Sequence, residues 1–164
     1  MKNIIRPIGG IMAYISGSGT KSAARILALA ALPFLLGGAS QPAASVDVSL
    51  TGLRNTKGQV LVCLTANPKG FPDCSKDKSA VQLVVKTSEA SHFKITAPGP
   101  GTYAIALIHD ENSSNKMDMR LFLPREGFGF SRNPAIGMGA PKFKSASFAV
   151  SGNTAQSIKM KYLL

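Results

Sequence analysis

The stretch HDENSSNKMD, residues 109–118, combines three acidic side chains with several Asn and Ser side chains. Counted from its first aspartate, side-chain oxygens fall at the first, third, fifth and ninth positions, which are Asp110, Asn112, Ser114 and Asp118. This spacing is typical of a calcium loop, in which alternating side chains turn toward one hard cation. The backbone carbonyl of Lys116, at the seventh position, would complete the predicted metal-binding set.

The match to a calcium loop is partial. Asn115 stands at the sixth position, where glycine normally makes a left-handed turn and Asn is the best substitute. The bidentate glutamate expected at the twelfth position is replaced by Leu121, and Glu126 could join only from a differently folded loop. The expected affinity for Ca²⁺ is therefore weak, about 10⁻⁴–10⁻³ M. The alternative is a loop whose polar side chains cap their own backbone and bind no cation.

The same stretch allows a catalytic interpretation, a hydrolase-like enzyme that uses His109 with Asp110 or Glu111. Such an enzyme needs a nucleophile, and Ser131 in GFGFSRN is the nearby candidate. Adjacent side chains on a strand point to opposite faces, so Asp110 is poorly placed to orient His109. The sequence also lacks a G-x-S-x-G elbow. We therefore favour a non-enzymatic role, in which His109, Glu111 and Glu126 brace the loop.

Short runs of alternating apolar and polar residues predict the strands that must position this loop. Seven such runs, separated by turn residues, are VDVSLTGL, QVLVCLTA, AVQLVVKT, HFKITAP, TYAIALIHD, FKSASFAV and AQSIKMKYLL. NTKG is expected to join the first two runs as a hairpin, and SGN the last two. The pattern predicts one all-β domain over residues 45–164, an antiparallel sandwich of about seven strands. A long loop, residues 110–142, is left over, and such length usually means function or local order.

The inward-facing positions of these strands predict the core. They are Val46, Val48, Leu50, Val60, Val62, Leu64, Leu83, Val85, Phe93, Ile95, Tyr103, Ile105, Leu107, Phe148 and Val150. Phe128 and Phe130 lie beside glycines in the long loop and are expected to fold back onto the sandwich. If they were exposed instead, they would form a binding surface.

Residues 1–44 have the features of a secretory signal peptide. Four basic residues and no acid precede the apolar run ILALAALPFLLGG, and small residues follow it. Cleavage is expected between about Ala39 and Ser45. The apolar run is shorter than the roughly 20 residues that cross a bilayer. The alternatives are translation from Met12 and an uncleaved membrane anchor.

Export bears on the two cysteines, because disulfides persist outside the cytoplasm. Cys63 and Cys74 flank a loop rich in proline and glycine, CLTANPKGFPDC. We expect them to form a disulfide, which would stabilise the domain by about 2–3 kcal/mol.

The exported part of the chain is basic, with 15 Lys and Arg residues against 8 acidic ones once the four leading basic residues are removed. The basic residues are scattered singly, and no helix carries a stripe of them, so we do not expect nucleic acid as a partner. Attraction to anionic envelope surfaces, such as lipid headgroups or lipopolysaccharide, is the functional alternative. A plain solvated basic surface is the simpler one.

The segments GTYAIALIHDENSSNKMD, LPREGFGFS and GAPKF resemble a bacterial family known as domain of unknown function 2141. The resemblance extends from about Val46 to Leu164, although members often have glycine where this chain has Ser113 and Asn115. It implies an exported sandwich of immunoglobulin-like or prealbumin-like kind in a Gram-negative-type envelope, in the periplasm, at the outer membrane or outside the cell. It supplies no catalytic residues. We therefore expect a binding or structural module of the envelope, with Ca²⁺ as the candidate ligand of its loop.

Overall fold

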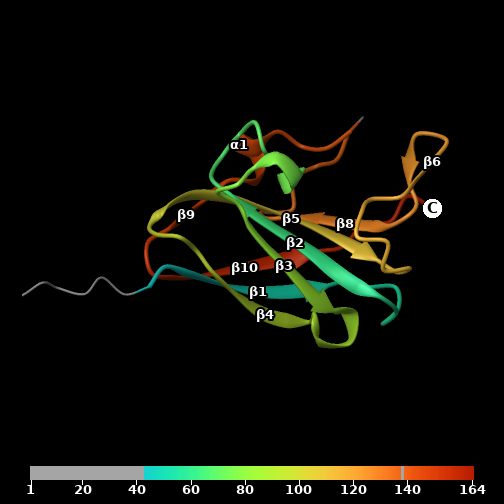
Figure 1. Cartoon of the computed structure of the whole chain (residues 1–164), viewed down its shortest axis with the longest axis horizontal. Coiled ribbons are helices and arrows are strands. Elements are labelled where there is room, and N and C mark those ends of the chain that lie inside the picture. Colours follow the sequence, from blue (N-terminus) through green and yellow to red (C-terminus); the bar gives the residue numbers. More distant parts are fainter. Residues whose placement is uncertain (1–42, 138) are drawn as a thin grey trace, which may run out of the picture. The chain divides into compact units, whose positions relative to one another are not determined.

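The computed structural model describes residues 43–137 and 139–164, so the predicted signal peptide lies almost wholly outside the described residues. Within these ranges the chain forms ten strands, two 3₁₀ turns and one short helix (Figure 1). In chain order they are β1 (Ser45–Thr51), β2 (Gln59–Thr65), η1 (Cys74–Lys76), β3 (Val81–Lys86), η2 (Thr87–Glu89), β4 (His92–Thr96), β5 (Gly101–Asp110), β6 (Met119–Arg120), β7 (Leu123–Pro124), β8 (Gly127–Phe130), α1 (Phe143–Ala146), β9 (Phe148–Val150) and β10 (Asn153–Lys159). None of the helices in the described part of the chain has the length and apolar character needed to cross a membrane.

The strands form two main sheets. One has the order β10-β1-β4, and the other has the order β3-β2-β5-β8, with β9 also pairing with β5. A separate two-stranded ribbon joins β6 and β7. The prediction of an all-β, sandwich-like domain is confirmed. Its strands pair antiparallel as expected except that β1 and β10 run parallel. The immunoglobulin-like or prealbumin-like kind stays a prediction.

The core lies between the two main sheets and matches the predicted set. Val46, Val48 and Leu50 alternate with half-buried residues along β1, as the period of a strand requires. They join buried side chains from β2, β4, β5 and β10 in one cluster. Leu83, Val85, Phe93 and Phe148 are partly buried and pack against that cluster, and every other predicted core residue is buried within it.

Both predicted hairpins are wrong. β1 pairs with β10 and β4, whereas β2 pairs with β3 and β5, so residues 52–58 cross from one sheet to the other. This connection is longer than the two to five residues of common hairpins. The turn at Ser151–Gly152 likewise joins β9 in one sheet to β10 in the other. Alternation places side chains on a face, but it does not choose the neighbouring strand.

The long loop is also more ordered than predicted, because residues 119–130 contain β6, β7 and β8. β8 continues the second sheet beside β5 and buries Phe128 and Phe130, which are only 6% and 7% exposed. The ring of Phe130 packs edge-on against Phe71, with centroids 5.8 Å apart. The alternative of an exposed binding surface at Phe128 and Phe130 is therefore wrong, because the two rings fill a second apolar cluster around the disulfide.

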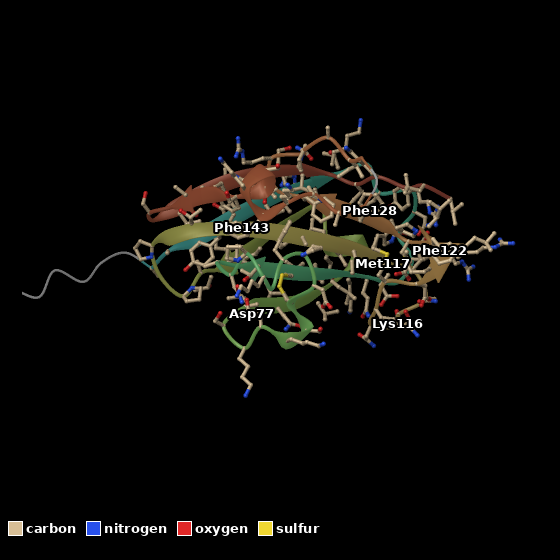
Figure 2. All side chains as sticks on the ribbon, turned by 90° about the horizontal axis from the view of Figure 1, so that it is seen from above. Asp77, Lys116, Met117, Phe122, Phe128 and Phe143 are labelled. Carbon is tan, nitrogen blue, oxygen red and sulfur yellow. A yellow bond between two sulfur atoms is a disulfide. The ribbon has the colours of Figure 1, made fainter. Side chains whose placement is uncertain are left out.

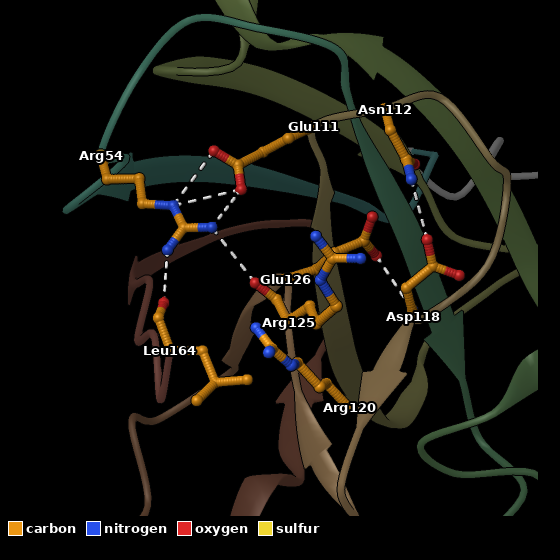
Figure 3. A pocket seen from close by; sticks show the side chains of 8 residues that line it. All are labelled: Arg54, Glu111, Asn112, Asp118, Arg120, Arg125, Glu126 and Leu164. Carbon is orange, nitrogen blue, oxygen red and sulfur yellow. Dashed lines mark hydrogen bonds and ion pairs between the residues drawn. The ribbon is translucent and has the colours of Figure 1, made fainter.

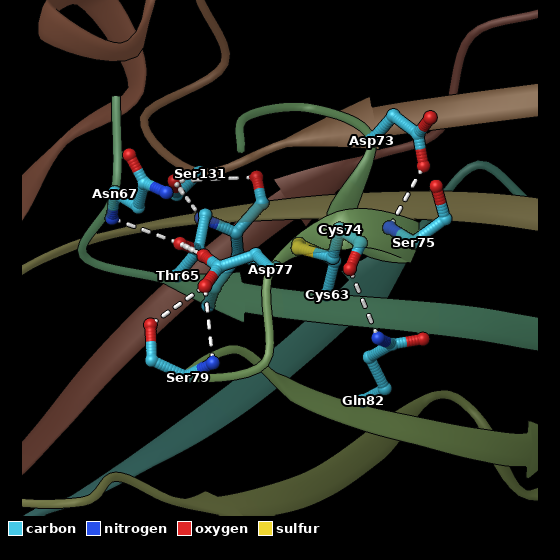
Figure 4. The surroundings of a disulfide bond; sticks show 11 residues. Cys63, Thr65, Asn67, Asp73, Cys74, Ser75, Asp77, Ser79, Gln82 and Ser131 are labelled. Carbon is cyan, nitrogen blue, oxygen red and sulfur yellow. Dashed lines mark hydrogen bonds between the residues drawn. A yellow bond between two sulfur atoms is a disulfide. The ribbon is translucent and has the colours of Figure 1, made fainter. Parts of the chain in front are cut away.

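The predicted disulfide between Cys63 and Cys74 is confirmed, with the two Cα atoms 6.0 Å apart (Figure 4). It ties η1 to β2. The amide of Gln82 donates to the carbonyl oxygen of Cys74 at 3.1 Å. Asp77 accepts hydrogen bonds from the hydroxyls of Thr65 and Ser79, at 2.5 and 2.6 Å, which hold the chain that follows.

Candidate functional site

The last two residues of β5 begin the site, and their side chains leave the strand on opposite faces. His109 and Asp110 are both fully buried. His109 Nδ1 lies 2.7 Å from the hydroxyl oxygen of Tyr162, and Nε2 lies 2.9 Å from the carbonyl oxygen of Lys57. Because both ring nitrogens are bonded, His109 joins the end of β5 to two segments that are distant in sequence.

The carboxylate of Asp110 organises the start of the polar loop, residues 110–118. Its Oδ1 accepts the backbone N–H of Ser114 at 2.9 Å, and its Oδ2 accepts the backbone N–H of Asn115 at 2.8 Å. The side-chain amide of Gln59 donates to the same Oδ2 at 2.9 Å. Burial by itself would raise the pKa of Asp110, but hydrogen bonds from Gln59, Asn115 and Ser114 outweigh it and lower that pKa. Asp110 is therefore a buried carboxylate whose charge is satisfied by donors.

The remaining polar side chains of the loop bond to one another. Asn112 accepts the backbone N–H of Ser114 at 3.1 Å and donates from Nδ2 to Asp118 at 2.8 Å. The Ser114 hydroxyl lies 3.3 Å from the Lys116 carbonyl oxygen. Asn115 has a φ of 62°, which is the left-handed conformation that the sixth position of a calcium loop requires. The loop thus shares the left-handed sixth position of such a turn, and Asx-type hydrogen bonds hold it.

Gly58 allows the crossing segment, residues 52–58, which connects the two main sheets, to approach the polar loop. Its φ is 67°, and a Cβ atom built on it would lie 2.1 Å from the carbonyl oxygen of Asp110. No side chain fits in that space. Gly58 is followed directly by β2, whose first residue is the Gln59 that donates to Asp110. The glycine therefore permits the contact on which the loop depends.

Glu126 precedes β8 and is 4% exposed. Its Oε2 accepts the backbone N–H of Asp118 at 3.4 Å, whereas its Oε1 is buried and has no hydrogen-bond partner among the described residues. Burial is the main reason that the pKa of Glu126 rises to about 7, although the backbone N–H of Asp118 lowers it. The charges of Asp110 and Asp118 raise the pKa further, and so does a hydrogen bond that protonated Glu126 can share with Asp110. Glu126 is the one carboxyl of the loop region whose charged form is poorly accommodated in the described structure.

A cavity of about 300 Å³ opens beside these groups (Figure 3). Its lining is strongly charged and comprises Arg54, Glu111, Asn112, Asp118, Arg120, Arg125, Glu126 and Leu164. It brings together the crossing segment, the polar loop and both sides of the β6–β7 ribbon. Three guanidinium groups and three carboxyl groups therefore line one hollow.

Arg54 closes one side of this cavity. Its guanidinium forms an ion pair with Glu111, donates to the carbonyl oxygen of Arg125 at 3.1 Å, and stacks 4.5 Å from the ring centroid of Tyr162. Arg54 and then Asn55 lower the pKa of Glu111 to about 2 despite its partial burial. The same Tyr162 bonds to His109, so His109 and Glu111 belong to one network.

The structure thus brings the predicted loop residues together, and it adds residues that the sequence did not single out. Arg54, Gln59 and Tyr162 hold Glu111, Asp110 and His109 respectively. Each pair is separated by about fifty residues, and no local spacing signals it. The polar residues of NTKG were visible as a turn signal, but their role beside the loop follows only from the crossing between sheets.

The groups named for the hydrolase alternative have structural contacts. Ser131 is fully buried; its hydroxyl donates to the carbonyl oxygen of Ala146 at 2.6 Å and accepts the backbone N–H of Ile105 at 2.9 Å. His109 is equally buried, and neither residue lines the charged cavity. These contacts favour packing and bracing roles for both.

A cation in the loop would need converging oxygens. In residues 43–137 and 139–164, no three side chains of His, Cys, Asp or Glu are arranged to hold a metal ion. The neutral oxygens of Asn112, Ser114 and Lys116 lie in the same turn and bond within it. They are of the kind that Ca²⁺ accepts together with carboxylates. Calcium binding at Asp110, Asn112, Ser114, Lys116 and Asp118 stays a prediction.

Comparison with known proteins places the chain in a family. Residues 48–159 match DUF2141, described as an uncharacterized protein conserved in bacteria. The chain belongs to this family, as its motifs suggested. The match covers both main sheets, the polar loop and Glu126. No curated protein and no solved structure matched the chain.

The close approach of Gly58 generates a first prediction. Gly58→Ala should lower the free energy of unfolding by more than about 1 kcal/mol, because the new methyl group meets backbone and the positive φ disfavours a side chain. Urea unfolding of the full chain measures the change. Gly99→Ala is the matched control, since a Cβ atom there meets nothing within 4 Å. Equal stabilities of the two variants would contradict the contact.

The buried acid generates a second prediction. The folded pKa of Glu126, about 7, lies above its usual 4.5, so the folded state binds more protons than the unfolded state between these values. Stability should therefore fall as pH rises from about 4.5 to about 7, by about 2–3 kcal/mol. Glu126→Gln should remove this loss. Urea unfolding at pH 5 and pH 8 tests it, and an unchanged pH dependence in the variant would contradict the assignment.

Proposed function

We propose that the chain is an exported, non-enzymatic binding module of the bacterial envelope whose loop, residues 110–126, takes up a divalent cation, with Ca²⁺ the best match. The observation that carries the proposal is the buried Oε1 of Glu126, which has no hydrogen-bond partner in the part of the chain that the structure describes. Glu126 also lies close enough to Asp110 and Asp118 for their charges to raise its pKa. A buried carboxylate without a partner is costly. A cation beside it removes that cost.

The loop offers oxygens of the right chemistry. Ca²⁺ takes six to eight oxygen ligands from carboxylates, amides, hydroxyls, backbone carbonyls and water. Asp110, Asp118 and Glu126 would supply charge after a local shift of the loop, because these three carboxylates do not converge on one point in the described residues. Asn112 and the Lys116 carbonyl would supply neutral donors. Glu126 would fill the role of the missing glutamate at position 121, reaching the loop from the start of β8. The left-handed turn at the sixth position is already formed in the described structure.

The cation would have a structural task. The backbone N–H of Arg125 donates to the carbonyl oxygen of Asp118 at 2.9 Å, which closes the base of the β6–β7 ribbon. Asp118 and Glu126 are the residues that flank this base. A cation bound between them would fix the ribbon against β5 and shape the charged cavity beside it. Binding of a partner would then depend on the loop, without any chemical step.

Export rests on the N-terminal sequence and is supported by the disulfide. A basic region followed by a short apolar run and small residues is typical of a signal peptide. The Cys63–Cys74 bond fits an oxidising compartment such as the periplasm or the cell exterior.

Calcium should therefore stabilise the chain. With a Kd near 10⁻⁴–10⁻³ M, 10 mM Ca²⁺ should raise the Tm of the oxidised full chain by about 5 °C relative to excess EDTA. The same concentration of Mg²⁺ should have little effect, because Mg²⁺ keeps its water and demands a tighter octahedral site. Thermal unfolding followed by circular dichroism measures both shifts.

Two variants make the experiment specific. Glu126→Gln should abolish the shift with Ca²⁺, whereas Glu111→Gln should keep it, because Glu111 lines the same cavity but is paired with Arg54. A Tm that does not respond to Ca²⁺ would contradict the proposal. So would a shift of equal size in both variants, since that would indicate only general screening of acidic groups.

A further inference from the structure

The β6–β7 ribbon ends in an unusual turn. Met119 pairs with Pro124 and Arg120 with Leu123, so the turn consists of two residues, Leu121 and Phe122. Their φ angles are 48° and 69°. Two-residue turns with two positive φ angles normally use Asn-Gly or Asp-Gly, because bulky side chains are strained there. Such an outlier in a surface turn points to a function of the displayed side chains.

The displayed side chains are apolar and unprotected. Phe122 is 95% exposed and Leu121 is 83% exposed, and Met119 and Leu123 on the two strands are also exposed. Figure 2 shows Phe122 at the same end of the domain as Lys116 and away from Asp77 of the disulfide loop. Other phenylalanines of the long loop are buried by the sandwich. This tip therefore lies outside the core, in a turn whose positive φ angles are unfavourable for Leu and Phe.

Basic residues flank the tip. Arg120 precedes it and Arg125 follows it, and both are exposed. Lys116 on the adjacent loop is also exposed, with its ammonium 3.9 Å from Asp118. In the part of the chain that the structure describes, no carboxylate lies within ion-pair distance of the guanidinium groups of Arg120 or Arg125. Exposed arginines with long apolar stems suit the level of lipid phosphates, where the stem contacts acyl chains and the guanidinium meets the headgroup.

We propose that the tip Leu121–Phe122 inserts into the headgroup region of an anionic lipid bilayer, with Arg120 and Arg125 binding lipid phosphates. A bilayer fits this tip better than a protein does. A stable protein interface buries roughly 800 Å² on each partner, which needs a broad surface rather than a two-residue turn. An interfacial anchor needs only a few apolar side chains and basic residues around them. This inference goes beyond the cation site and does not require it.

The chain contains no tryptophan, so Phe122→Trp gives a single fluorophore at the tip. In the full chain, vesicles of phosphatidylglycerol should shift its emission to the blue, and brominated acyl chains should quench it. Phosphatidylcholine vesicles should give neither effect. Replacing both arginines, by Arg120→Gln and Arg125→Gln, should weaken partition into phosphatidylglycerol about thirtyfold at low salt.

Val84→Trp on β3 is the matched control, because Val84 is 62% exposed and lies on a main sheet, outside the β6–β7 ribbon. Its emission should not be quenched, even if residues 1–42 bring the chain to the vesicle. Absence of quenching in Phe122→Trp, or equal quenching in both variants, would overturn the proposal. Blue-shifted emission that depends on protein concentration without lipid would also overturn it, because a second copy would then cover the tip.

Discussion

The buried carboxylate of Asp110 is the constraint on which the candidate site depends. It lies at the end of β5 with no exposed surface, where an unpaired charge would be strongly destabilising. Three donors satisfy it: two backbone N–H groups of the loop and the side chain of Gln59 on the neighbouring strand. Because two of these donors lie four and five residues further along the chain, the charge can be satisfied only if the backbone turns back on itself.

That turn positions the residues that follow it, up to Glu126. It brings Asp118 beside Glu126, and the bond between the Arg125 N–H and the Asp118 carbonyl starts the β6–β7 ribbon. On the opposite face of the same strand end, His109 holds Tyr162, against which Arg54 stacks while it pairs with Glu111. The alternation of side chains along β5 therefore sends Asp110 into the acidic loop and His109 toward Tyr162, against which the cavity-lining Arg54 stacks. The proposed cation site lies in the loop that Asp110 holds, and the proposed lipid-binding tip lies at the turn of the β6–β7 ribbon within it.

Sequence reasoning worked where the determinant is local. The period of two placed Val46, Val48 and Leu50 in the core, and the Asn and Asp spacing of the loop signalled its turn. It failed for strand pairing, because alternation does not distinguish β10 from β2 as the neighbour of β1. Glu126 was named as a brace, and as a ligand only for a differently folded loop, since its approach to Asp118 depends on the ribbon between them. The exposed Leu121–Phe122 tip was missed for the same reason.

Asp110 holds the loop and, through it, the ribbon. Hydrogen exchange of the full chain with Asp110→Asn tests it most directly, because asparagine keeps the shape but replaces one acceptor oxygen by a donor. We expect the amides of Ser114 and Asn115 to exchange at least about tenfold faster in the variant. Protection should also fall across residues 111–126. The β10-β1-β4 sheet should keep its protection. Unchanged exchange at Ser114 and Asn115, or an equal loss of protection in every strand, would contradict it.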